Sequence, residues 1–455
     1  MRPHHFLLIG YLLFGSLSIF GEGSLAGKRP NILLIVTDDQ GMKDVGCYGS
    51  EIPTPNIDAL ASDGAKFTRW YSASSICTPS RFGMLTGRNP SRSRDQLLGA
   101  LMFLAEDDKK RGLRRSETTV ATALKTLGYD TALIGKWHLG HGSKEFWPTQ
   151  HGFDYFYGHT AGCIDFFTMS YGNTLDWYRN ETLLDEPGYA TDLLTADAIR
   201  FLKQKRKTPF FLLLAYNAPH FGKGWNDGEN ETVNLMQPHP RDLERVRTIK
   251  DPTRRKFAAK TVGLDRSIGE VMQVLDEEQL SDKTLVVFMT DHGGDSNYGG
   301  ANEPFRNGKA TLFEGGIRVP CLMRWPKVIP RSLEVSAAAS ALDFFPSFLD
   351  LAGADSSRWS GLDGESFLPL LKGETGSPRS FYWGLGEHLD LQRARWEAFM
   401  QGEWKYVQDG AGSEYLFNLE SDPYERTNLQ TQNPFMFKSL KEGLQRARKS
   451  FQTLR

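Results

Sequence analysis

A cysteine opens a motif whose residue types suit the binding of an anion beside a reactive group. The run CTPSRFGMLTGR spans residues 77–88, with Pro79 two residues after Cys77 and Arg81 four residues after it. Proline is favoured in the first turn of a helix and glycine at its end, so the run predicts a helix that stops at Gly87. The free N–H groups of the helix N-terminus favour negative charge, and Arg81 adds a cation. The motif therefore predicts a site for an anionic substrate; the alternative is a small buried cysteine or half of a disulfide.

Two pairs of polar residues end strongly apolar runs that lie far apart in the chain. Asp38 and Asp39 follow the run ILLIVT, and Asp291 and His292 follow the run LVVFMT. Ligands of open α/β sheets bind beyond the carboxyl ends of the strands. Adjacent carboxylates repel one another unless a cation lies between them, and three carboxylates suit a hard divalent ion, calcium before magnesium. Turn or capping chemistry is the alternative for each pair, and a substrate contact is the alternative for His292, because imidazole suits softer metals.

Lysine and histidine side chains form a third group of candidates. Lys136 and His138 follow one predicted strand, His220 ends another, and Lys309 lies in the loop RNGK. A tetrahedral dianionic ester needs cations around its non-bridging oxygens and an acid for the leaving oxygen, and these side chains offer both. Taken singly, such residues are more often solvated charges or capping histidines. The interpretation therefore requires a fold that brings them together.

The order of apolar runs predicts an α/β fold. Nearly continuous apolar runs, typical of strands buried on both faces, occur at residues 31–37, 130–135, 209–216, 284–290 and 317–325. Helical periodicity lies between them, at residues 120–127, 264–275 and 337–351. Strands that alternate with helices indicate a large mixed central sheet sandwiched by helices.

The pattern changes after Gly373. Short aromatic runs separated by turn residues follow, and residues 434–453 have the pattern of a closing helix. This arrangement predicts a small antiparallel sheet with one helix. We therefore expect a signal peptide (1–26), a catalytic α/β domain (27–373) and a smaller C-terminal α+β subdomain (374–455).

The N-terminus and the composition indicate an exported protein. Basic residues precede an apolar stretch at residues 6–20, and small residues follow it, as in a secretory signal peptide. The stretch is short for a transmembrane helix, so we expect no stable membrane insertion and a periplasmic, extracellular or lumenal location after cleavage. The chain of 455 residues carries 54 Lys and Arg against 55 Asp and Glu, which gives no reason to expect a nucleic-acid partner. Its 4 cysteines are spaced too widely for a zinc module.

Together these motifs resemble the type I, formylglycine-dependent sulfatases, which include the arylsulfatases, of the alkaline phosphatase superfamily. The likeness rests on the CTPSR motif, the two aspartate-containing strand ends, the basic segments in the same order, and the closing segment YLFNLESDP at residues 415–423. It implies an alkaline-phosphatase-like fold and an exported sulfuric ester hydrolase.

The resemblance also implies the cofactors. A formylglycine-generating maturation enzyme would convert Cys77 to formylglycine (3-oxoalanine). One Ca²⁺ per chain would be held by Asp38, Asp39, Asp291, His292 and an oxygen of the modified Cys77.

The roles of the remaining residues follow from the same resemblance. One hydroxyl of the formylglycine hydrate would attack sulfur while the metal and Arg81 hold it as an alkoxide. His220 or Lys309 would protonate the departing alcohol, and His138 would act as the base when the aldehyde forms again and sulfate leaves. Lys136 belongs to the same catalytic set.

The substrate implied is a sulfated small molecule or glycan. The aromatic-rich segment 153–178 predicts either a platform for a sugar or aryl group or packing in the core. Three alternatives remain at this point: a phosphate mono- or diester or phosphonate ester hydrolase of the same superfamily, a binding protein that retains the fold, and a thiol hydrolase that uses Cys77.

Overall fold

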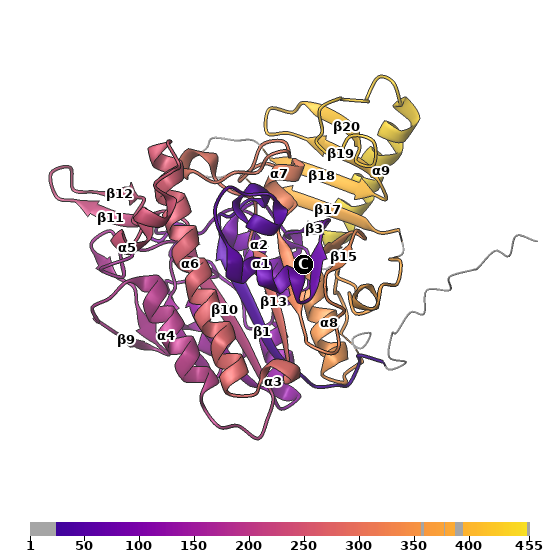
Figure 1. Ribbon diagram of the computed structural model, residues 1–455. Coiled ribbons are helices and arrows are strands. Elements are labelled where there is room, and N and C mark those ends of the chain that lie inside the picture. Colours follow the sequence, from indigo (N-terminus) through magenta and orange to yellow (C-terminus); the bar gives the residue numbers. More distant parts are fainter. Residues whose placement is uncertain (1–23, 356–358, 377, 387–394, 453–455) are drawn as a thin grey trace, which may run out of the picture.

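The computed structural model describes residues 24–355, 359–376, 378–386 and 395–452. Most of the predicted signal peptide lies outside these residues. The described chain forms a large sheet between helices, with a smaller sheet and the last helix at one end (Figure 1). This arrangement confirms the predicted fold class. No helix within the described ranges is both long enough and apolar enough to cross a membrane.

A mixed sheet of 10 strands forms the middle layer of the described chain. Its central strand pairs in parallel with a neighbour on each side and is buried on both faces. Ile32, Leu34 and Val36 of this strand contribute to one hydrophobic core. Leu33 and Ile35 contribute to the other. The strands, in order across the sheet, are β15 (Leu333–Val335), β2 (Ala65–Phe67), β14 (Cys321–Arg324), β13 (Thr284–Thr290), β1 (Asn31–Asp38), β10 (Phe210–Pro219), β4 (Asp130–Lys136), β5 (Tyr155–His159), β8 (Tyr178–Arg179) and β9 (Thr182–Leu183).

Helices cover both faces of the central sheet. The core that contains Leu33 is closed by α1 (Pro55–Ser62), α4 (Ala190–Leu202) and α6 (Pro252–Glu277), of which α4 and α6 lie side by side (Figure 1). The opposite core is closed by α2 (Cys77–Thr86), α3 (Val120–Thr126) and α8 (Phe344–Leu351). Short helices α5 (Pro240–Leu243) and α7 (Glu314–Ile317) lie in connections. As predicted, α2 stops at Gly87, which takes a left-handed conformation (φ 63°) that glycine adopts without strain.

Two predicted elements differ from the observed ones. The strand expected at residues 317–325 begins only at Cys321, because Ile317 completes α7 and Pro320 has no N–H to donate to a sheet. The helix expected at residues 337–351 begins at Phe344. Before it, β16 (Ala339–Ser340) pairs with β3 (Trp70–Tyr71), and a 3₁₀ turn capped by Ser340 follows. Long-range pairing outweighs local helical periodicity there.

The C-terminal part forms a second antiparallel sheet with one helix, as expected. Its strands are β17 (Ser380–Leu385), β18 (Trp396–Gln401), β19 (Trp404–Gln408) and β20 (Glu414–Asn418), and the helix is α9 (Pro434–Gln452). A buried ion cluster joins this sheet to α7. Nζ of Lys405 on β19 lies 2.8 Å from Oε1 of Glu314 and 2.9 Å from Oε1 of Glu425, and all three side chains are excluded from solvent.

We expect Lys405→Met to destabilise the protein strongly. Methionine fills the volume but leaves the buried Glu425 without a cation among the described residues and Glu314 with only Arg318, whose Nη1 lies 3.4 Å from its Oε2. Breaking a buried pair in this way costs about 3–5 kcal/mol. Thermal unfolding followed by circular dichroism measures the loss. The control is Lys438→Met, whose lysine is exposed on α9 and 4.0 Å from Glu442, and which should change stability little. A Lys405→Met protein as stable as the wild type would contradict the structural role of this cluster.

Candidate active site

The candidate residues gather at the carboxyl ends of neighbouring strands. β1 and β13 run in parallel with Thr37 opposite Thr290, so the residues that follow the two strands lie side by side. Asp39 takes a left-handed backbone conformation (φ 63°), which turns the chain directly after β1. β4 and β10 end at the same edge, because both are parallel to β1. The sheet edge therefore unites motifs that are far apart in the sequence.

Cys77 lies buried at the first residue of α2. Its Sγ lies 3.1 Å from Nε2 of His292 and donates a hydrogen bond to Oδ1 of Asp38 at 3.5 Å. Burial raises the pKa of the thiol, but the positive charges of Lys136, His292 and Lys309 outweigh it and lower the pKa from 9.0 to about 6. The surroundings of Cys77 thus favour negative charge.

Two lysines pair with the carboxylates that follow β1. Nζ of Lys136, at the end of β4, lies 2.5 Å from Oδ2 of Asp38, and both side chains are excluded from solvent. Nζ of Lys309 lies 2.7 Å from Oδ1 of Asp39. Burial, together with the negative charges of Asp38 and Cys77, raises the pKa of Asp39 to about 8. The positive charge of Lys309 opposes this rise only in part. For Asp38 the attraction of Lys136 and other cations outweighs burial and holds the pKa well below its usual value.

Arg81 pairs with Asp291, the first residue after β13. Nη2 of Arg81 lies 3.1 Å from Oδ2 of Asp291, and both side chains are buried. Nη1 of Arg81 also donates to the carbonyl oxygen of Lys136 at 3.1 Å. Burial and the charge of Asp38 raise the pKa of Asp291 to about 6, although His292 and Arg81 oppose the rise. The guanidinium therefore connects α2 to the ends of both β13 and β4.

Two of the histidines are held as neutral imidazoles. Nε2 of His220 lies 3.2 Å from Nζ of Lys309 and 3.3 Å from Oδ2 of Asp39, and burial together with Lys309 holds its pKa well below the usual value. Nε2 of His138 lies 2.9 Å from the carbonyl oxygen of Leu101, and its Nδ1 has no described hydrogen-bond partner. Burial, then Lys136, lowers the pKa of His138 to about 3.

A cluster of four side chains has the arrangement of a metal site. The ligand atoms of Asp38, Asp39, Cys77 and His292 all lie within 4.8 Å of one another, and all four residues are buried. Asp291 lies beside the cluster, with Oδ1 3.7 Å from Nε2 of His292. Burial lowers the pKa of His292, but the negative charges of Asp291, Cys77 and Asp39 raise it to about 10. A cation is therefore favoured at this point, and the carboxylate oxygens fit a hard metal ion.

A cavity of 330 Å³ opens above Cys77, within the range of roughly 300–1,000 Å³ that holds a small organic ligand. His138, His220 and Lys309 line it together with Cys77. Its walls are largely apolar and aromatic: they include Leu101, Met102, Tyr171, Phe221 and Tyr298.

Most of the residues that line this cavity were not predicted from the sequence. Phe156 and Trp177 of the aromatic segment are buried in the core, so packing explains them, whereas Tyr171 on β6 (Ser170–Tyr171) reaches the cavity. Phe221 and Tyr298 come from outside that segment, and their rings lie 4.3 Å apart. Of these wall residues, only Phe221 could have been suspected from the sequence, because it directly follows the candidate residue His220.

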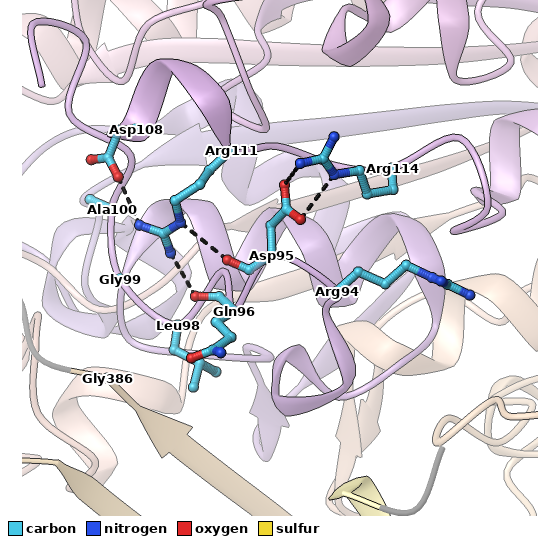
Figure 2. Close-up of a pocket in the computed structure, with 10 residues that line it drawn as sticks. All are labelled: Arg94, Asp95, Gln96, Leu98, Gly99, Ala100, Asp108, Arg111, Arg114 and Gly386. Atoms are coloured by element: carbon cyan, nitrogen blue, oxygen red, sulfur yellow. Dashed lines mark hydrogen bonds and ion pairs between the residues drawn. The ribbon is translucent and has the colours of Figure 1, made fainter. Parts of the chain in front are cut away.

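A second cavity, of 480 Å³, is shown in Figure 2, and Ala100 lines both this cavity and the first one. Its two acidic residues are each paired with an arginine: Oδ1 of Asp108 lies 2.7 Å from Nη1 of Arg111, and Oδ2 of Asp95 lies 2.7 Å from Nη2 of Arg114. The described residues that line it include neither a nucleophile nor a metal-ligand cluster. The chemistry therefore lies in the cavity above Cys77.

Comparison with known proteins agrees with this geometry. Residues 30–354 match the family model described as Sulfatase. The chain belongs to the sulfatase family. Residues 306–450 of this sulfatase also match the model of the C-terminal region of N-sulphoglucosamine sulphohydrolase. The resemblance noted from the motifs is thus confirmed.

Relatives and solved structures extend the match over most of the sulfatase. It is 32% identical to human (Homo sapiens) steryl-sulfatase, over 82% of this chain and 75% of that protein. It is 31% identical to the N-acetylgalactosamine-6-sulfatase of Canis lupus familiaris, over 86% of this chain and 78% of that protein. The crystal structure of Ps i-CgsB in complex with k-i-k-neocarrahexaose superposes with a TM-score of 0.82 at 31% identity, covering 92% of this chain and 93% of that chain. This sulfatase is therefore an enzyme that hydrolyses sulfuric esters.

Proposed function

We propose that this sulfatase releases sulfate from a sulfated carbohydrate or aryl-type ester by means of formylglycine formed from Cys77 and one bound Ca²⁺. The observation that carries the proposal is the position of Cys77: its Sγ lies 3.1 Å from His292 and 3.5 Å from Asp38, at the base of a ligand-sized cavity. Hydrolysis of 4-nitrophenyl sulfate and 4-nitrophenyl phosphate by the enzyme matured in its own host tests it. We expect sulfate to be the faster substrate; faster hydrolysis of the phosphate would contradict the proposal.

The residues that would hold Ca²⁺ are Asp38, Asp39, Asp291, His292 and an oxygen of the modified Cys77. The fit is supported by the donor set, because three buried carboxylates supply hard oxygen ligands and excess negative charge. His292, whose Nδ1 lies 3.0 Å from the carbonyl oxygen of Gly293, would bind through Nε2. When bound, the cation would offset the charge of the carboxylates and polarise a sulfate oxygen.

The remaining side chains suit the handling of charge and protons. Once formed from Cys77, hydrated formylglycine would supply the nucleophilic hydroxyl and a second hydroxyl for the release of sulfate. We assign Arg81, Lys136 and Lys309 to orienting the reacting groups and compensating their negative charge. We assign the donation of a proton to the leaving oxygen to His220 or Lys309, whose Nε2 and Nζ atoms lie 3.2 Å apart. We assign His138 as the base, because it lines the same cavity and its Nδ1 has no described hydrogen-bond partner. Burial and Lys136 lower the pKa of this histidine, and an anionic substrate beside it would raise the pKa again.

Removal of the metal should abolish activity reversibly. Dialysis against a chelator is expected to lower turnover at least about a hundredfold, since the carboxylates left behind repel an anionic substrate. Ca²⁺ should restore the rate better than Mg²⁺, because it tolerates irregular oxygen coordination. Atomic emission analysis of the protein before and after dialysis checks the metal content. Full activity in a metal-free sample would contradict the assignment.

We further propose that the protein is exported after cleavage of a signal peptide spanning residues 1–26 and that a formylglycine-generating enzyme matures it. Residues 27–373 would form the catalytic domain and residues 374–455 the C-terminal subdomain. Two relatives are named steryl-sulfatase and N-acetylgalactosamine-6-sulfatase, and one similar solved structure is a complex with k-i-k-neocarrahexaose. A sulfated glycan is therefore the substrate that we favour.

A further inference from the structure

A hairpin forms one wall of the catalytic cavity. It consists of β11 (Gly222–Asn226) and β12 (Glu231–Leu235), begins two residues after His220 and stands out from the sheet (Figure 1). Lys223 on β11 and Asn234 on β12 are directly opposed in the hairpin, and both line the cavity. The hairpin therefore supplies a cation to the cavity in addition to those at its base.

Neighbouring side chains hold Lys223 in position. Its Nζ donates to Oδ1 of Asn234 at 2.8 Å, and Nδ2 of Asn234 donates to the hydroxyl of Tyr298 at 2.6 Å. Nζ also lies 5.7 Å from the centroid of the Tyr171 ring. The ring of Tyr298 packs against that of Phe221 with 4.3 Å between the ring centroids, and the ring of Phe221 packs against that of His220 with 4.1 Å between the centroids. A connected wall thus runs from Lys223 to the base of the cavity.

Lys223 has only an uncharged hydrogen-bond partner among the described residues. Among the described residues no carboxylate forms an ion pair with it, whereas the cations at the base of the cavity have carboxylate partners, such as Asp39 for Lys309. Asp295 is the only carboxylate among the described residues that line the cavity, and its Oδ1 accepts from the backbone N of Asn297 at 3.0 Å. A half-buried cation in largely apolar surroundings attracts anions more strongly than one in open solvent.

We propose that Lys223 binds a second anionic group of the substrate, either a carboxylate or another sulfate, on the unit that carries the scissile ester. This inference rests on the proposed function of the same cavity. The base of the cavity binds the reacting sulfate, the aromatic wall packs against the ring of the leaving group, and Lys223 contacts the second anion at the mouth. Lys223 is a specificity residue in this account, since it does not touch the reacting atoms.

The test compares singly and doubly anionic esters. The probes are phenyl sulfate, 3- and 4-carboxyphenyl sulfate and 1,4-phenylene disulfate, which separate a carboxylate from a sulfate as the second anion. In Lys223→Met, the ratio of kcat/KM for a doubly anionic probe to that for phenyl sulfate is expected to fall about 10- to 100-fold, as for loss of a charge-assisted hydrogen bond. Added salt should reduce the wild-type ratio toward that of the variant.

Two variants and one binding measurement make the result decisive. Lys223→Arg should retain the preference, and Lys207→Met should leave the ratio unchanged, because Lys207 is exposed just before β10, at the end opposite His220. Dissociation constants of the same probes, measured by calorimetry in a Cys77→Ala background, should show the same ratio without turnover. An equal effect of Lys223→Met on all probes, in turnover and in binding, overturns the inference. Failure of the wild type to hydrolyse phenyl sulfate, with the binding ratio intact, would count against the proposed aryl activity alone.

Discussion

Cys77→Ala is expected to abolish sulfate release. The methyl group of alanine can be converted neither to an aldehyde nor to any other nucleophile, so the group that attacks sulfur is lost. Groups that act as one catalytic unit typically contribute several orders of magnitude, and we expect turnover to fall by at least about a thousandfold. Initial rates with 4-nitrophenyl sulfate, at enzyme concentrations high enough to detect this residual activity, measure the effect.

The fold should tolerate the change. Removing one buried sulfur atom leaves a small cavity at the N-terminus of α2, and the expected loss of stability is about 1 kcal/mol. Cys47→Ala is the matched control, because Cys47 is a half-buried cysteine outside the residues that line the catalytic cavity. It should retain activity. Near-normal turnover by Cys77→Ala, or equal losses in both variants, would contradict the assigned role of Cys77.

Asp291→Asn is expected to weaken both metal binding and catalysis. The amide keeps the shape of the carboxylate but removes its negative charge, which we assign to the metal and which also pairs with Arg81 at 3.1 Å. Substitutions that disturb even the outer partners of a metal typically cost about 10- to 100-fold in affinity, and loss of a ligand should cost at least as much. Competition with a fluorescent chelator measures the affinity, and the rate is measured in the same samples.

A matched variant separates metal binding from loss of a buried ion pair. Asp343 is also a buried carboxylate, and it accepts from Nη1 and Nη2 of Arg379 at 2.7 and 2.8 Å, away from the catalytic cavity. Asp343→Asn should lower stability while leaving metal affinity unchanged. If Asp291→Asn loses activity but responds to chelator like the wild type, then Asp291 positions Arg81 and is not a metal ligand.

The positions of the strand-end motifs could be predicted because they follow from the geometry of parallel strands. β1 and β13 are continuous apolar runs, which identify strands buried on both faces, and parallel strands deliver whatever follows them to one edge of the sheet. Asp38 and Asp291 therefore lie close together in space. Their neighbours Thr37 and Thr290 are 253 positions apart in the sequence. The helix that begins at Cys77 was equally visible, because Pro79 and Gly87 act locally.

Features that depend on distant partners were not predictable in this way. Ala339 and Ser340 have helical neighbours in sequence but pair with β3, so the helix after them begins later than its periodicity suggests. Lys223 is an ordinary lysine in the sequence, and only the pairing of β11 with β12 places it at the cavity. The same is true of Tyr298, whose aromatic partner Phe221 lies far away along the chain.

The chemical state of Cys77 distinguishes formylglycine chemistry from thiol chemistry. The enzyme would be purified from its own host and digested with trypsin, and the mass of the peptide spanning residues 70–81 would be measured. We expect a peptide that carries an aldehyde, or its hydrate, in place of the thiol, together with a product of reaction with hydroxylamine. An intact thiol in active enzyme, trapped by iodoacetamide with loss of activity, would contradict the formylglycine mechanism and indicate a thiol hydrolase instead.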